Sequence, residues 1–189
     1  MTPQAPSSDD AALARRAAQG DERAFAELVS RHKEPLYRLM RRYTGDADQA
    51  YEAVHEAFIA VWRTLARFDP ERPFVAWLRT IAFNKARDLA RRRAVHRFLL
   101  GSDALEESAL VVSDASEDAE AQLIQQQRVA ALDRAVAKLP ARLKEALILT
   151  AFDGRSQKEA GDILGVSEKA IETRVYRARK LLAVALGPD

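Results

Sequence analysis

The sequence predicts an all-α protein built from two small helical domains joined by a flexible acidic linker. Apolar residues recur at the three- and four-residue spacing of helices along most of the chain, and no stretch alternates apolar and polar residues as a strand does. Residues 98–127 contain no Lys or Arg but seven Asp or Glu, so they separate the helices before them from those after them. We therefore expect a disordered N-terminus at 1–8, a first domain at 9–97, a linker at 98–121 and a second domain at 122–186.

Composition excludes several classes of protein. The 30 basic and 28 acidic residues nearly cancel to a net charge of +2, so the distribution of charge is more informative than its sum. The absence of cysteine excludes disulfides, thiolate metal sites and cysteine nucleophiles. No apolar run approaches the roughly 20 residues that span a bilayer, and the N-terminal "MTPQAPSSDD" lacks the basic and apolar regions of a signal peptide. We expect a cytoplasmic protein without membrane insertion.

The first domain opens with two predicted helices. Asp9 or Asp10 can cap a short helix that stops at Gly20, where a positive φ costs little. Asp21 then caps a second helix, whose apolar residues continue at helical spacing as far as residue 43. Because proline lacks the backbone N–H, we expect Pro35 to kink or locally break this helix.

Two further helices complete the first domain. The turn "TGDAD" (44–48) leads into a helix from about 47 to 67, whose apolar face is Val54, Phe58, Val61, Trp62 and Leu65. "FDPERP" (68–73) is a loop, with its last proline suited to a first helical turn. The fourth helix follows and ends in the basic run 91–93.

The second domain contains a helix-turn-helix pattern. One helix ends at Pro140 and another runs over 142–152 before Gly154 breaks it. "SQKEAGDIL" (156–164), with Ser at its start as a cap, forms the first helix of the motif, and "GVS" forms the turn. Gly165 suits a position that needs unusual backbone angles, and the small Gly161 lets the two helices approach closely.

The helix after this turn is amphipathic. Its apolar stripe, which must pack inward, is Ile171, Val175, Ala178 and Leu182. Glu172 can accept from a cytosine amino group, and Arg177 can pair with guanine or phosphate. The residues expected to contact DNA are Lys169, Glu172, Thr173, Arg174, Tyr176, Arg177, Arg179 and Lys180. The alternative is an amphipathic helix with a solvated basic face.

Two long stretches resemble the extracytoplasmic-function (ECF) sigma factors, small bacterial relatives of sigma-70 that keep only regions 2 and 4. "GDADQAYEAVHEAFIAVWRTLARFDPERPFVAWLRTIAFNKARDLARRR" (45–93) is similar to region 2, and "LPARLKEALILTAFDGRSQKEAGDILGVSEKAIETRVYRARKLL" (139–182) is similar to region 4. The stretches follow the family's order, with a variable linker between them. The resemblance implies a protein that directs core RNA polymerase to specific promoters, in a stress or envelope response, with no cofactor and no enzyme activity.

The resemblance also implies roles for residues. Region 2 of the family docks on the coiled coil of the polymerase β′ subunit, and the matching residues here are Glu52, His55 and Glu56. It captures unstacked bases of the −10 element, and the matching residues are Phe68, Asp69, Arg72, Asn84, Lys85, Arg87, Arg91 and Arg92. Their basic members would supply the cationic track that a single strand needs. Region 4 would read the −35 element and hold the β flap, and an anti-sigma factor is an expected partner.

The chain departs from the family pattern at two places. The usual "DLVQE" is "EAVHE" (52–56) here, which keeps an acid at both ends. Gly161 stands where alanine is usual and Ala160 where isoleucine is usual, which predicts a less rigid first helix of the motif.

Other functions remain open from the residues alone. One is a helix-turn-helix regulator whose N-terminal domain senses a ligand or dimerises, and another is a sigma mimic that sequesters an anti-sigma factor. The basic run at 91–93 favours the sigma factor over both. Glu52 and His55 form a Glu-x-x-His, half of a carboxylate di-iron site. Because neither other histidine has Glu three residues before it, no metal site is expected.

Overall fold

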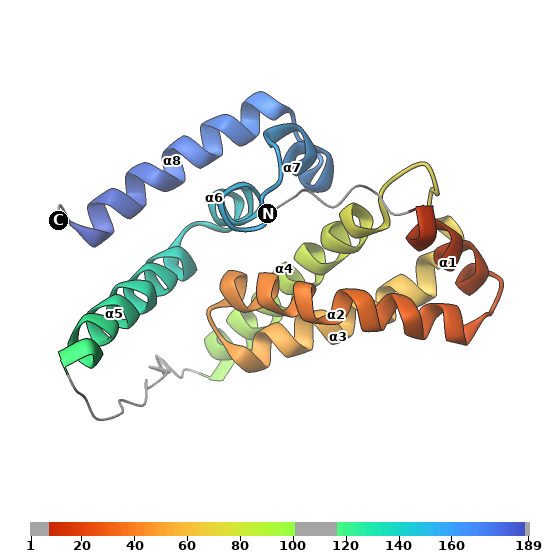
Figure 1. The fold of residues 1–189 in the computed structure, drawn as a ribbon, viewed down its shortest axis with the longest axis horizontal. Helices are drawn as coiled ribbons and strands as arrows, with labels where there is room; N and C mark the ends of the chain where they lie inside the picture. Colours follow the sequence, from red (N-terminus) through yellow and green to blue (C-terminus); the bar gives the residue numbers. More distant parts are fainter. Residues whose placement is uncertain (1–7, 101–116, 188–189) are drawn as a thin grey trace.

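The computed structural model describes residues 8–100 and 117–187, and all the regular structure in these ranges is helical (Figure 1). The helices are α1 (Ser8–Ala18), α2 (Glu22–Thr44), α3 (Ala47–Thr64), η1 (Leu65–Arg67), α4 (Phe74–Leu100), α5 (Glu117–Lys138), α6 (Ala141–Leu147), η2 (Ile148–Phe152), α7 (Gln157–Leu164) and α8 (Glu168–Leu186). The predicted all-α fold of two helical parts is confirmed. We call α1–α4 the N-terminal block and α5–α8 the C-terminal block.

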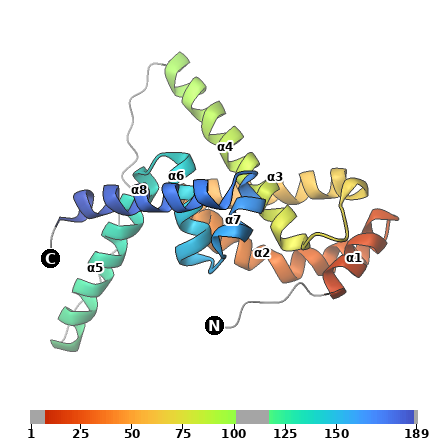
Figure 2. The ribbon, with the colours of Figure 1, turned by 90° about the horizontal axis from the view of Figure 1, so that it is seen from above.

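Helices reach further into the stretch between the blocks than predicted. α4 continues to Leu100 and α5 begins at Glu117, so helix covers 98–100 and 117–121 of the predicted linker. The rest of the predicted linker, 101–116, and residues 1–7 of the predicted disordered start lie outside the described residues. Figure 2 shows the C-terminal half of α4 projecting away from the other helices.

The N-terminal block is a bundle of α2, α3 and α4, with α1 packed against α2 and η1 at one end (Figure 1). The predicted cap of α2 is confirmed, because the Asp21 carboxylate accepts the Ala24 N–H at 3.0 Å. Asp46 caps α3 in the same way through the Gln49 N–H at 2.7 Å. Such caps satisfy backbone donors that a helix leaves unpaired at its start.

Of the predicted kink or local break at Pro35, the break is wrong. α2 runs without interruption from Glu22 to Thr44 with Pro35 inside it. Leu28 on one side of the proline and Leu36 and Met40 on the other are buried in the same core. Burial of both halves therefore holds the helix together where local propensity opposes it.

The C-terminal block contains the predicted helix-turn-helix. Ser156 and Glu159 form a reciprocal capping box at the start of α7, and Gly165 ends that helix with a φ of 66°. A Cβ on Gly161 would lie 2.6 Å from the carbonyl oxygen of Val166, so the close approach expected of this glycine is present. α8 begins at the predicted cap, where Ser167 accepts the Ala170 N–H at 3.2 Å.

The helix predicted over 142–152 is divided into two forms. α6 is α-helical and η2 is a π-helix. The Asp153 N–H reaches the Ile148 carbonyl at 2.9 Å, a span of five residues that widens the last turn. Ile148 and Leu149 within this wide turn are fully buried, so packing compensates for the weaker helical geometry.

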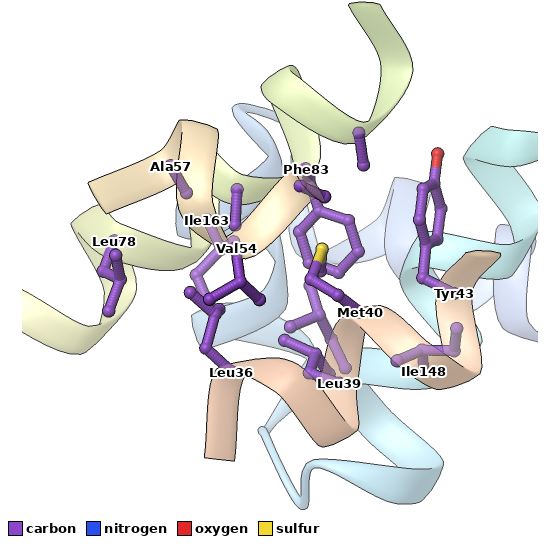
Figure 3. Packing of buried hydrophobic residues seen from close by; sticks show 14 of the residues in the cluster. Leu36, Leu39, Met40, Tyr43, Val54, Ala57, Leu78, Phe83, Ile148 and Ile163 are labelled. Carbon is purple, nitrogen blue, oxygen red and sulfur yellow. The ribbon is translucent and has the colours of Figure 1, made fainter. Parts of the chain in front are cut away.

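Apolar side chains join the two blocks. Ile148 of η2 and Ile163 of α7 belong to the same buried cluster as Leu39, Met40 and Phe83 of the N-terminal block (Figure 3). The phenyl ring of Phe83 also meets the ring of Tyr43 edge to face, with 5.2 Å between their centroids. The blocks therefore pack against each other through a shared core.

Polar groups surround this shared core, and a buried carboxylate lies among them. Glu145 of α6 is 2% exposed and accepts a hydrogen bond from the Tyr43 hydroxyl at 3.2 Å. Arg87 of α4 forms an ion pair with the same carboxylate at 3.3 Å. Elsewhere on the interface, the Thr80 hydroxyl donates to the Ile163 carbonyl at 2.9 Å. The two blocks are thus joined by specific hydrogen bonds as well as by apolar burial.

Tyr43→Phe removes the hydroxyl that donates to Glu145 and keeps the ring. We expect the free energy of unfolding to fall by about 1.5–3 kcal/mol, the usual worth of a hydrogen bond to a charged group. Urea denaturation followed by circular dichroism measures the change. Tyr51→Phe is the control, because Tyr51 is 58% exposed and its loss should change stability by less than about 0.5 kcal/mol. If the two changes lowered the free energy of unfolding equally, the proposed contribution of the Tyr43–Glu145 hydrogen bond would be contradicted.

Ser156→Ala removes the cap of α7 and should destabilise the chain by about 1 kcal/mol at neutral pH. Hydrogen bonds from the Ser156 backbone and then its hydroxyl hold the pKa of Glu159 below its usual value. A lowered pKa means that this stabilisation is present above the usual value and is lost as pH falls through the folded-state value. Thermal unfolding from pH 7 to pH 3 should therefore show the wild type and the variant converging. Lys158→Ala, in the same turn, is the control, and parallel curves would contradict the capping box.

Candidate DNA-binding surfaces

α8 packs with one face and exposes the other, as predicted. Its apolar stripe is buried: Ile171, Val175, Ala178 and Leu182. α7 crosses near the N-terminal end of α8, which leaves the opposite side of α8 uncovered along its length (Figure 1). This is the arrangement in which a second helix can enter a major groove while the first lies across it.

The exposed side of α8 carries most of the residues predicted to contact DNA. Its exposed members are Lys169, Glu172, Thr173, Tyr176, Arg177, Arg179 and Lys180. The Lys169 ammonium lies 2.7 Å from the Glu172 carboxylate, and the Thr173 hydroxyl donates to the Lys169 carbonyl at 2.9 Å. A cytosine amino group would therefore share the Glu172 carboxylate with Lys169.

Arg174 differs from its neighbours because it is half-buried. Burial raises the pKa of Glu145, and the charges of Arg87 and Arg174 together with the Tyr43 hydrogen bond oppose that rise. Arg87 is a candidate contact for the −10 element and Arg174 for the −35 element. Of these two candidate DNA-contacting cations, Arg87 forms an ion pair with the buried carboxylate at 3.3 Å, and the charge of Arg174 adds a smaller electrostatic contribution.

The candidate −10 residues fall into two groups. Phe68 is only 9% exposed, and its ring packs against Phe74 and Trp77 at centroid distances of 5.7 and 5.1 Å. Asp69 and Arg72 are exposed in the loop beside it, and the Asp69 carboxylate accepts the Glu71 N–H. Phe68 thus anchors the loop to the core, while its two polar neighbours face solvent.

The second group lies along α4. Asn84, Arg87 and Arg91 share one side of the helix, and the Asn84 side-chain oxygen accepts from Arg87 at 2.5 Å. Arg92 is exposed, and Lys85 is half-buried with its ammonium 3.7 Å from Glu56. At about 1.5 Å per residue, Arg91 stands roughly 25 Å from the start of α4. The loop and the basic stripe are therefore separate parts of one extended surface.

The residues predicted to dock core polymerase lie on α3. His55 is exposed, whereas Glu52 and Glu56 are half-buried. Glu52 forms an ion pair with Arg93 of α4, and Glu56 lies near Lys85. The acids of this candidate docking face therefore pair with basic residues of α4, one of which, Lys85, is itself a candidate −10 contact.

Within the described ranges, the sequence interpretation missed five charged residues that form ion pairs between the blocks. These are Arg42, Arg79, Asp133, Glu145 and Asp153. Two of them carried a signal, because Arg79 lies inside "WLRTIA" and Glu145 inside "LKEALIL". A charged residue within an apolar stretch of helix indicates a buried pair. Nothing in the sequence identified the partner of either residue.

Neither a metal cluster nor a membrane helix is found in the part of the chain that the structure describes. Over 8–100 and 117–187, no three His, Asp or Glu side chains gather as a metal ion would require. None of the helices in these ranges is both long and apolar enough to cross a membrane.

Comparison with known families and proteins gives consistent matches in the same order along the chain. A model of Sigma-70 region 2 matches residues 28–95, and a model of Sigma-70 region 4 matches residues 130–182. The RNA polymerase sigma factor CnrH of Cupriavidus metallidurans is 39% identical over 186 residues, which cover 97% of each chain. The RNA polymerase sigma factor NccH of Alcaligenes xylosoxydans xylosoxydans is 40% identical over 181 residues, 95% of each chain.

Solved structures match the fold as well. The structure of CnrH in complex with the cytosolic domain of CnrY has a TM-score of 0.67 and 35% identity, and covers 94% of this chain and 97% of that one. The sigma factor RpoE of Bartonella quintana, solved with the anti-sigma factor NepR, has the same fold with a TM-score of 0.66 and 24% identity over 86% of this chain and 96% of its own. The chain thus belongs to the sigma-70 family of RNA polymerase sigma factors, as a member of its ECF group.

Proposed function

We propose that this sigma factor divides promoter recognition between its blocks, the C-terminal block reading the −35 element and the N-terminal block holding the melted −10 element. The observation that carries the proposal is the geometry of α8. Its buried stripe fixes the helix to the block and turns Lys169, Tyr176 and Lys180 outward. Polar groups aimed at base edges and flanking cations for phosphates are what a major-groove helix requires.

The exposed stripe of α4 supports the role of the N-terminal block. Asn84, Arg87 and Arg91 lie on one side of the helix, with Arg92 beside them. A melted strand exposes its phosphates and bases together, so it binds a cationic track next to polar groups. Asp69 and Arg72, held in place by the buried Phe68, would contact bases at the start of that track.

Core RNA polymerase is the proposed partner that these promoter contacts would bring to the DNA. The α3 face with Glu52, His55 and Glu56 would dock on the β′ coiled coil, and the C-terminal block would hold the β flap. Such a protein acts by binding in the cytoplasm, and polymerase supplies the chemistry. CnrH, 39% identical, has been solved with the cytosolic domain of CnrY, and RpoE with an anti-sigma factor. We therefore also propose that this chain has an anti-sigma partner.

Run-off transcription tests the proposed function directly. Purified core polymerase with this chain should initiate from a subset of a promoter library, and the chain should co-purify with core enzyme. Core polymerase alone is the control. Co-purification without initiation at any promoter would favour a sigma mimic, and DNA binding without co-purification would favour an ordinary helix-turn-helix regulator.

Two changes on α8 separate phosphate contacts from base contacts. Lys180→Ala should weaken binding to all −35 sequences alike and flatten its dependence on salt, because each phosphate contact releases counterions. Glu172→Ala should instead relax the choice of base at one or two −35 positions, reducing the discrimination at each by about 1–3 kcal/mol. Binding of a randomised −35 library at several salt concentrations measures both effects. Uniform loss of affinity in both variants would contradict the assigned roles.

A further inference from the structure

The ion pairs between the two blocks all have the positive charge on the same block. Arg42 lies 3.4 Å from Asp133, Arg79 lies 2.8 Å from Asp153, and Arg87 lies 3.3 Å from Glu145. In every ion pair that joins the blocks within the described ranges, the arginine belongs to the N-terminal block and the carboxylate to the C-terminal block. We call Arg42, Arg79 and Arg87 the interface arginines and their partners the matching carboxylates.

Arg79 has more hydrogen-bond donors than Asp153 accepts from, so an anion with more oxygens could satisfy its guanidinium more fully. Its side chain is 9% exposed, and only one of its donors, an Nη2 proton, reaches the Asp153 carboxylate. Its Nε and Nη1 atoms are buried without an acceptor among the described residues. A guanidinium carries five N–H donors in a planar fork, and a phosphate offers oxygens that can accept from several of them at once.

The interface arginines are also continuous with the track proposed to hold the −10 strand. Arg79 and Arg87 are both on α4, eight residues apart, which corresponds to about 12 Å along the helix. One strand of duplex DNA carries a phosphate about every 3.4 Å along the axis. A distance of this size therefore spans three or four phosphates of a duplex strand, and fewer of an extended single strand. Arg87 already forms a hydrogen bond with Asn84 of the track.

The remaining interface arginine has a second contact with the C-terminal block. The Arg42 guanidinium stacks over the Phe152 ring at 4.2 Å from its centroid. A stacked guanidinium keeps its in-plane donors available for oxyanions, because the ring covers only its face. Separation of the blocks would remove both Phe152 and Asp133 from Arg42 and leave a third guanidinium free to bind oxyanions.

We propose that the interface arginines form a phosphate-binding surface for promoter DNA, and that the matching carboxylates occupy it as an internal substitute for the DNA backbone when the blocks are packed together. DNA binding and packing of the blocks then compete for the same three guanidinium groups. The identity of the DNA as promoter rests on the proposed function, whereas the competition itself can be measured without polymerase.

The test uses the full chain with D133N/E145Q/D153N, which removes the three charges and keeps side chains that can hydrogen-bond. The control is E22Q/E34Q/D48N, which changes net charge equally at three exposed positions on α2 and α3, outside the helix-turn-helix and these ion pairs. Small-angle scattering measures the radius of gyration, and fluorescence anisotropy with a short labelled single-stranded oligonucleotide measures DNA affinity against salt. Circular dichroism checks that each variant stays helical.

We expect D133N/E145Q/D153N to expand and to bind the oligonucleotide more tightly than the control. Because each phosphate contact on a single strand contributes about 0.7 to the slope of log affinity against log salt, the slope should steepen by about 2. The oligonucleotide should also expand the wild-type chain. An unchanged radius and slope in D133N/E145Q/D153N, or a gain that the control reproduces, would overturn the proposal.

A second variant tests whether the interface arginines bind DNA or only hold the two blocks together. Adding R42Q and R79Q to D133N/E145Q/D153N should return the salt slope most of the way to that of the wild type, while the chain remains expanded. If affinity and slope stay high without these arginines, they only hold the blocks together and the DNA-binding proposal is wrong. Failure of run-off transcription with these binding results intact would count against the sigma function and leave the competition standing.

Discussion

The arrangement of the molecule depends on burying Glu145 without leaving its charge uncompensated. A carboxylate removed from water is costly unless hydrogen bonds and an opposite charge replace its hydration. Here the replacements come from the other block, through the Tyr43 hydroxyl and the Arg87 guanidinium. Separation of the blocks would remove both of these contacts, so the burial of this carboxylate depends on the packing of the blocks.

This dependence links two surfaces that would otherwise act separately. Arg87 belongs to the candidate −10 track and pairs with Glu145, whereas Arg174 belongs to the candidate recognition helix and acts on the same carboxylate only through its charge. The outward residues of α8, such as Tyr176 and Lys180, take no part in the packing and stay exposed. One part of the candidate DNA-binding charge is therefore engaged inside the molecule, while another part is presented to solvent.

Local features were predictable from sequence because their causes are local. The caps at Asp21 and Ser156, and the αL turn at Gly165, follow from short-range hydrogen bonds and sterics. The continuous α2 through Pro35 and the π-helical η2 depend on burial against distant segments. The candidate site divides in the same way between local and distant causes. The exposed stripe of α8 could be predicted from the periodicity of its own residues. The partner of Arg79 could not, because it lies in the other block and nothing in the sequence links the two residues.

The close approach of Gly161 to the Val166 carbonyl has a consequence for how this protein can change over generations. A backbone-to-backbone contact at the turn sets the position of α8 relative to α7, and buried aliphatic side chains hold it there. The outward side chains of α8 take no part in that support. Substitutions among them therefore carry little penalty in folding. If α8 reads the −35 element as proposed, the genes under the control of this factor can diverge faster than its scaffold.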